Sequence, residues 1–161
     1  MNRSDILVPL NLEKDSLEGL KYAAQAAGEM SLHTTLLNVV ELNIFPLDRR
    51  VYDEICLESQ AKLRQFADSF REDRFRVCVR IGKPDEQILA EARESGVEVI
   101  VMGAPRNHHR RWPFRSTNVE RVVRDAPCLT LVMTEPWKSA APRHGLPVSL
   151  FARNHPELMP H

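Results

Sequence analysis

Three things are scarce in this 161-residue sequence: cysteine, an excess of either charge, and long hydrophobic runs. Its three cysteines, Cys56, Cys78 and Cys128, are spaced too widely for a disulfide framework or a zinc site. Lysine and arginine total 22, and so do aspartate and glutamate, so no overall field draws the chain to nucleic acid or an anionic membrane. No apolar run approaches the roughly 20 residues that cross a bilayer. We therefore expect no nucleic-acid partner and no membrane association.

We also expect no secretion signal at the start of the sequence. Residues 1–10 hold one arginine, a very short apolar run and Pro9, where a signal peptide would need a longer hydrophobic stretch. With reduced cysteines, which we interpret as small buried hydrophobes, this predicts a cytoplasmic protein. Hydrophobic residues at 43% and charged residues at 27% are typical of a globular chain. The length suits one domain, which we place at residues 1–136.

Apolar segments of strand length alternate with segments in helical register. Strands are predicted at residues 5–10, 34–40, 75–81, 97–102 and 128–134. Helices are predicted after Ser16, over residues 51–70, from Pro84 to a stop at Gly96, and after Ser116 or Thr117. Within residues 75–81, apolar residues alternate with more polar ones, which predicts a strand at a sheet edge. This order predicts an α/β fold with an open, doubly wound, five-stranded parallel sheet and helices on both faces.

A ligand crevice follows from this topology. In open α/β sheets the crevice lies beyond the carboxyl ends of the strands, where the winding reverses. Those ends are expected near Pro9 and Asn11, near Val39, and from Met102 and Gly103 onward. These segments form the predicted functional site.

Three strings of residues resemble a known family. They are Ile-Leu-Val-Pro-Leu-Asn at 6–11, Val-Ile-Val-Met-Gly-Ala at 99–104, and Ser-Thr-Asn-Val-Glu-Arg-Val-Val-Arg-Asp-Ala-Pro-Cys-Leu-Thr-Leu-Val at 116–132. With the order of elements, they make the chain similar to the universal stress protein family over residues 3–134. The resemblance implies a strand order of 3-2-1-4-5, a role in the stress response, and homodimers formed through the last strand, residues 128–134.

The same resemblance bears on nucleotide binding. Members that bind ATP carry a loop after the fourth strand with the pattern Gly, two residues, Gly, nine residues, Gly, then Ser or Thr. Backbone N–H groups and the following helix N-terminus hold phosphates in such a loop. Here Gly103 matches the first glycine, but Arg106 and Ser116 replace the second and third, while Thr117 keeps the hydroxyl. Asn11 stands where binding members usually carry an aspartate.

The site that this resemblance implies consists of Pro9, Asn11, Val39, Met102, Gly103, Arg106, Ser116 and Thr117. A side chain where the loop needs a left-handed backbone costs on the order of 1 kcal/mol, and its bulk fills space that a phosphate would use. We therefore expect nucleotide binding to be weakened or lost, so that no cofactor is certain and ATP or AMP is the alternative.

That alternative comes from the positive charge of the same loop. Arginine clamps phosphate through paired hydrogen bonds, so an arginine-rich loop can replace backbone donors. A solvated basic loop is the simpler interpretation. The two adjacent histidines point in opposite directions in an extended chain, which argues against zinc. The arginines and histidines of this basic loop are Arg106, His108, His109, Arg110, Arg111 and Arg115.

Residues 137–161 differ in composition from the rest of the chain. Four prolines oppose regular structure and predict a tail, while apolar residues keep open its docking on a protein partner. The sequence has no nucleophile elbow, no phosphate-loop lysine motif and no close Cys/His pair, so we expect no enzyme. The predicted function is a universal stress-type regulator that acts by dimerisation and partner binding. The alternative is an ATP- or AMP-binding switch.

Overall fold

The computed structural model describes residues 5–12, 32–41, 48–70, 74–103 and 118–133, together with the backbone of 149–150. The strands are β1 (Ile6–Pro9), β2 (Thr34–Val40), β3 (Phe75–Ile81), β4 (Val99–Gly103), β5 (Leu129–Met133) and β6 (Ser149–Leu150). The helices are α2 (Arg49–Asp68), α3 (Pro84–Ser95) and α4 (Asn118–Asp125). The helix predicted after Ser16 lies outside the described residues. Among the described residues, no helix combines the length and hydropathy needed to cross a membrane.

The strands form one sheet in the order β3-β2-β1-β4-β5-β6. The first five strands are parallel, which confirms the predicted strand order of 3-2-1-4-5 and the edge position of β3. β6 is the exception, because it runs antiparallel to β5. The expected five strands are therefore joined by a sixth from the predicted tail, and β5 is not the last strand of the sheet. A strand of two residues is too short to show a period of two in the sequence.

The sequence pattern located the longer strands accurately. β2 and β3 have the predicted bounds and pair residue by residue, from Thr34 opposite Phe75 to Val40 opposite Ile81. β1 is shorter than predicted, β5 begins one residue later, at Leu129, and β4 begins two residues later, at Val99. The predicted last residue of β5, Thr134, lies outside the described residues. A strand ends where its backbone pairing with the neighbouring strand stops, and the type of side chain does not indicate that position.

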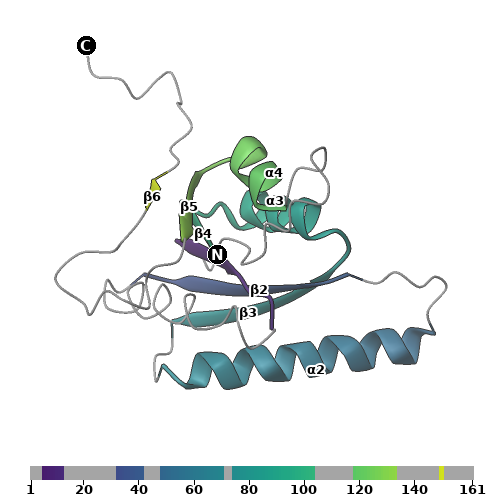
Figure 1. Ribbon diagram of the computed structural model, residues 1–161. Coiled ribbons are helices and arrows are strands. Elements are labelled where there is room, and N and C mark those ends of the chain that lie inside the picture. Colours follow the sequence, from purple (N-terminus) through teal and green to yellow (C-terminus); the bar gives the residue numbers. More distant parts are fainter. Residues whose placement is uncertain are drawn as a thin grey trace, which may run out of the picture.

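The two faces of the sheet bury separate cores, and helices cover both faces (Figure 1). One core packs strand residues such as Val8 and Leu36 against α2, where Leu63 and Phe66 are buried. The other packs Leu7 and Leu37 against α3 and α4. Each fully buried leucine contributes roughly 1.5–3 kcal/mol to folding. The doubly wound arrangement is thus confirmed for α2, α3 and α4.

The ends of α3 follow the predicted signals. Pro84 occupies its first turn, where the missing backbone N–H of proline costs nothing. Gly96 ends the helix with a left-handed backbone, at φ 61°, and its N–H donates to the Ala92 carbonyl. These ends place α3 directly after the carboxyl end of β3, next to the predicted crevice.

Candidate functional site

The carboxyl ends of β2, β1 and β4 lie side by side, because these parallel strands are neighbours in the sheet. Pro9 stands opposite Leu37 in the β1–β2 pairing, and β1 pairs on its other side with Val99 and Ile100 of β4. The structure therefore brings Pro9, Val39 and Gly103 to one end of the sheet, as the crevice prediction requires.

Asn38 fixes the chain where it leaves β1. It is buried, and its Nδ2 donates a hydrogen bond of 2.9 Å to the carbonyl of Leu10. The Leu10 N–H donates in turn to the Leu37 carbonyl at 2.7 Å. These two bonds hold the segment that leads into Asn11 against β2. The sequence analysis missed Asn38, although a single amide inside an otherwise apolar strand was a usable signal.

The predicted site residues differ in what they offer to a ligand. Asn11 is exposed, whereas Pro9 and Val39 are half-buried. The side chain of Met102 is 6% exposed and packs in the core under α3 and α4, so only its backbone faces the strand end. Gly103 is exposed, and a Cβ at this position would meet no described atom within 4 Å. Among the described residues, nothing therefore blocks a close approach to Gly103.

The remaining predicted site residues, Arg106, Ser116 and Thr117, lie outside the described residues, as does the basic stretch between them. Helices α3 and α4 are described. Arg121 on α4 pairs with the buried Asp85 in the first turn of α3, with 2.9 Å between Nη1 and Oδ2. Burial alone would raise the pKa of Asp85, but the Arg121 hydrogen bond and charge bring it below its ordinary value. This pair ties α4 to the first turn of α3.

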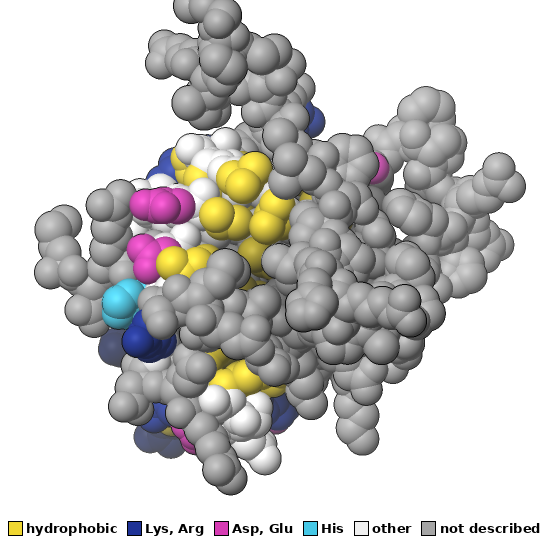
Figure 2. Space-filling view, turned by 90° about the vertical axis from the view of Figure 1, so that its left-hand side faces the viewer, with side chains coloured by type: hydrophobic (Ala, Val, Ile, Leu, Met, Phe, Trp, Pro, Cys, Tyr) yellow, Lys and Arg dark blue, Asp and Glu magenta, His cyan; other side chains and the backbone are white. Residues whose placement is uncertain are grey.

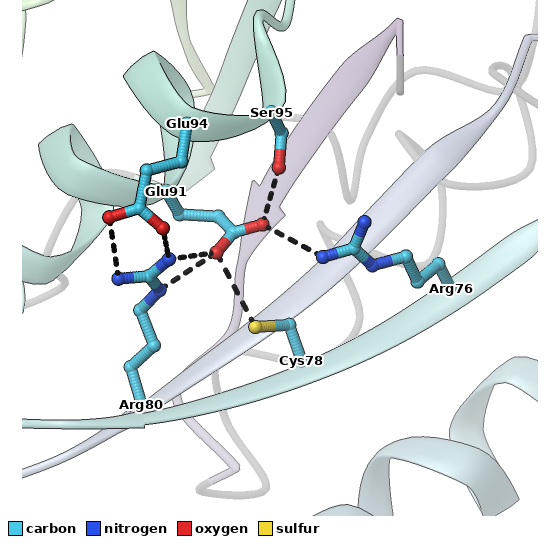
Figure 3. Close-up of polar contacts among 6 residues, drawn as sticks. All are labelled: Arg76, Cys78, Arg80, Glu91, Glu94 and Ser95. Atoms are coloured by element: carbon cyan, nitrogen blue, oxygen red, sulfur yellow. Dashed lines mark hydrogen bonds and ion pairs between the residues drawn. The ribbon is translucent and has the colours of Figure 1, made fainter. Parts of the chain in front are cut away.

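A second group of polar side chains lies between β3 and α3, and we call it the Glu91 cluster (Figure 3). Glu91 is 2% exposed and accepts a hydrogen bond of 2.6 Å from Ser95 Oγ. Arg80 Nε donates to the same carboxylate at 2.7 Å, and Arg76 Nη2 at 3.3 Å. Arg80 also pairs with Glu94. The members are Arg76, Cys78, Arg80, Glu91, Glu94 and Ser95.

The electrostatics of the Glu91 cluster indicate a structural role. Its two arginines and two glutamates balance in charge, so it offers no net field to an anion or a cation. Burial alone would raise the pKa of Glu91, but hydrogen bonds from Ser95 and Arg80 bring it below its ordinary value. The carboxylate therefore stays ionised and bound to its partners rather than exchanging protons. The sequence pattern predicted the polar face of β3, but it did not predict that Glu91 would pair with the arginines of that face.

The cysteines are free thiols, as expected for a chain without disulfides. Cys78 is half-buried, and its thiol donates to Glu91 at 3.5 Å, so it is more than the small hydrophobe that we predicted. Burial raises the pKa of Cys78 and of Cys128, which keeps both thiols protonated. Over the described residues, no group of three or more histidine, cysteine, aspartate or glutamate side chains is placed to hold a metal ion.

We call the side of β5 that faces away from β4 the β5 edge. The strand begins with the apolar residue Leu129. Leu129 is 39% exposed, and Leu131 is half-buried. Hydrophobic side chains gather on this side of the molecule in the space-filling view (Figure 2). β6 pairs with β5 only at Leu131 and Val132. The β5 edge therefore belongs to a mostly apolar strand, and the short strand β6 covers part of it.

Comparisons with known proteins agree with this fold. A family model described as the universal stress protein family matches residues 2–134. Comparison with curated protein sequences gives no significant match. Among solved structures, the chain is similar to universal stress protein UspA from Lactobacillus plantarum, at 21% identity and a TM-score of 0.58, over 82% of this chain and 97% of that one.

Two further solved relatives were crystallised with nucleotides. One is a universal stress protein in complex with cAMP, with 15% identity, a TM-score of 0.64, and coverage of 83% of this chain and 98% of that one. The other is the universal stress protein from Archaeoglobus fulgidus in complex with dAMP, with 16% identity, a TM-score of 0.54, and coverage of 82% and 98%. At these identities the structures show a shared fold, while the family model covers most of the chain. This protein therefore belongs to the universal stress protein family.

Proposed function

We propose that this chain is a regulatory protein that acts by forming homodimers and binding a partner, with nucleotide binding weakened or lost. The observation that carries the proposal is the β5 edge, where Leu129 is 39% exposed on a strand with only two residues paired to β6. An apolar strand edge presents backbone donors and acceptors to a second strand, and a two-fold pair of such strands makes a closed dimer.

The weakening of nucleotide binding rests on the residues at the crevice. Gly103 leaves room at the end of β4, but Arg106 and Ser116 stand where family members that bind ATP have glycines. Asn11 offers an amide in place of a carboxylate that would face a bound metal ion. The described polar side chains near this end of the sheet bond to other parts of the chain: Asn38 donates to the Leu10 carbonyl, and Arg121 pairs with Asp85. These two interactions hold the local structure together, and their polar groups are already engaged rather than reserved for a phosphate.

The second candidate is an ATP- or AMP-binding switch with an arginine-rich loop. It is favoured by the solved relatives that were crystallised with cAMP and dAMP. The positive charge at 106–115 is chemically suited to phosphate, since guanidinium groups bind it in a bidentate manner. This candidate shares the fold and the crevice with the first and differs in what fills the crevice.

Sedimentation of the purified chain over a wide concentration range tests dimerisation. We expect a monomer–dimer equilibrium, and we expect Leu131→Pro to abolish the dimer because proline removes a backbone donor from the strand. Leu131→Val is the matched control, since it keeps that donor and the β-branched shape suits a strand. Circular dichroism checks that both variants fold. A wild-type chain that stays monomeric at every concentration contradicts the proposal.

Calorimetry with ATP, ADP and AMP, with and without magnesium, separates the two candidates. The proposal expects no heat at millimolar nucleotide, which corresponds to a binding free energy weaker than about −4 kcal/mol. Micromolar binding that disappears in the variant Arg106→Ala would favour the switch instead. Mass spectrometry of the denatured protein is a direct second measurement, because it reveals any nucleotide that co-purifies.

We also propose that the protein is not an enzyme and that it works in the cytoplasm. The three free thiols suit a reducing compartment, where disulfides do not persist. The polar clusters of the described residues, around Glu91 and around Asp85, are closed ion pairs rather than an acid and a base facing open space. Assays of nucleotide hydrolysis at high protein concentration test the first point, and fractionation of cells that express the chain tests the second.

A further inference from the structure

The one antiparallel strand of the sheet comes from the tail. β6 pairs with the outer side of β5, with Leu150 opposite Leu131 and Ser149 opposite Val132 (Figure 1, yellow arrow). The five preceding strands pair with one another in parallel. The β5 edge, which a second copy would need, is thus already in use by the same chain.

The position of β6 on β5 matters more than its length. In a symmetric antiparallel pair of β5 strands, the two-fold axis passes near the middle of the strand. Leu131 is the third of the five residues of β5, so β6 lies over the middle of that surface. Backbone N–H and C=O groups at one edge can pair with one strand at a time. Pairing with β6 and pairing with a second copy therefore exclude each other.

The pairing of β6 is also easily lost. Two residues form at most a few backbone hydrogen bonds, whereas a second copy of β5 offers five residues. Leu129 lies on the part of β5 that β6 does not pair with, and its 39% exposed side chain gives an incoming strand a first apolar contact. A short strand that competes with a longer one shifts an equilibrium rather than blocking it.

We propose that β6 is an intramolecular competitor that covers the β5 edge and raises the concentration at which the chain dimerises. This inference rests on the proposed function, since it assumes that dimers form through β5. A molecule whose edge is covered most of the time binds its partner with an affinity reduced by the uncovered fraction. In a symmetric dimer both copies must uncover, so the reduction applies twice. Release of the tail by another protein would then trigger dimerisation.

The first test removes the pairing while keeping the full chain. Successive residues of a strand direct their N–H groups to opposite sides, so the double variant Ser149→Pro/Leu150→Pro removes whichever donor faces β5. The matched control is Ser149→Ala/Leu150→Ala, which truncates the same side chains and keeps both donors. By sedimentation, we expect the proline variant to dimerise with a dissociation constant about tenfold lower or more than that of the wild type. We expect the alanine variant to stay close to the wild type.

The second test asks where β6 lies without reference to dimers. Leu131→Cys with Leu150→Cys places two thiols at opposite positions of an antiparallel pair, whose Cα separation of about 4.5–5.5 Å suits a disulfide. Peptide mass mapping after oxidation distinguishes a bond within one chain from a bond between chains and from bonds to the native cysteines. We expect the bond within one chain, and a monomer that regains dimerisation on reduction.

The outcomes separate the two proposals. An intrachain disulfide together with stronger dimerisation of the proline variant supports the inference. A disulfide only between chains, or none, overturns it and leaves dimerisation through β5 intact. An intrachain disulfide with a proline variant that stays monomeric at every concentration overturns the proposed function, and with it the regulatory role of β6.

Discussion

The two outer strands of the parallel sheet, β3 and β5, protect their edges in different ways. β3 carries Arg76 and Arg80 on the face toward α3, where the Glu91 cluster binds them. β5 has no charged residue, and its first residue, Leu129, is 39% exposed. Two β3 edges brought together would place arginines beside arginines, which is unfavourable. Two β5 edges brought together would bury Leu129 without placing like charges side by side.

Under the proposed function, this difference would direct association to the β5 side of the sheet. On β3, both arginines pair with Glu91, whose side chain is 2% exposed. The β5 edge has no charged residue, and the two-residue strand β6 covers its middle. One edge thus carries charge, and the other is covered by a short strand of the same chain. Four substitutions test this contrast, and they follow in order of decreasing expected effect.

Glu91→Ala should give the largest effect, because it leaves Arg80 without its buried partner. We expect the free energy of unfolding to fall by about 3 kcal/mol, as when one member of a buried ion pair is removed. Urea denaturation measures it. The control is Glu94→Ala, whose carboxylate is 64% exposed and pairs with the same arginine; here we expect at most about 1 kcal/mol. Equal losses in both variants would mean that the buried carboxylate has no special part in holding β3.

Leu129→Lys makes the β5 edge resemble the β3 edge. We expect the dimer dissociation constant to rise about tenfold, because a two-fold pair would bring lysines close together. The free energy of unfolding should change by no more than about 0.5 kcal/mol at this exposed position. Leu57→Lys on α2 is the matched control, since Leu57 is 66% exposed and lies away from the edge. If both variants weaken the dimer equally, the surface that forms it is not the β5 edge.

Acid should weaken the β3 side through Glu91. Its pKa in the folded chain is below the ordinary value of 4.5, so its contribution to stability is complete above that value and is lost as the pH falls through the folded pKa. We expect the free energy of unfolding of the wild type to decline below pH 4.5. Glu91→Gln removes this titration and should decline less steeply over the same range. Leu129→Lys should keep the wild-type slope, since β5 has no carboxylate; a wild-type slope in the Gln variant would contradict the assignment.

Arg76→Val should have the smallest effect on stability. Its side chain is 48% exposed and lies 3.3 Å from Glu91, so we expect a loss within about 0.5 kcal/mol. The change removes one charge from the β3 edge and adds a residue that favours strands. We therefore expect slight self-association, detectable by light scattering at high concentration. Arg76→Lys keeps the charge and should stay as the wild type; scattering from both variants would point to a cause other than the edge.

The sequence predicted the fold well where side-chain pattern alone decides it. β3 was placed at an edge because Arg76 and Arg80 alternate with apolar residues, and the structure confirms that position. Pro84 and Gly96 predicted the ends of α3, because proline is favoured in the first turn of a helix and glycine at its left-handed end. These signals are local, so they can be interpreted without knowing which residues lie nearby in the folded chain.

Features that depend on partners were not predicted. Glu91 looks like any solvent-facing residue of a charged helix until α3 is packed on β3 and brings Arg80 to it. Asn38 was likewise hidden inside an apolar strand, since its partner is the backbone of another strand. β6 is two residues long and follows a proline-rich stretch, so no periodicity marks it. The predicted loop residues Arg106, Ser116 and Thr117 lie outside the described residues, and their roles stay predictions.

The fifteen residues between the end of β5 at Met133 and the start of β6 at Ser149 set how often the two strands meet. A short link between two segments of one chain gives each an effective concentration on the order of millimolar at the other. A separate molecule at micromolar concentration meets the β5 edge about a thousand times less often. Dilution therefore leaves the pairing of β6 with β5 unchanged, whereas it would dissociate a dimer.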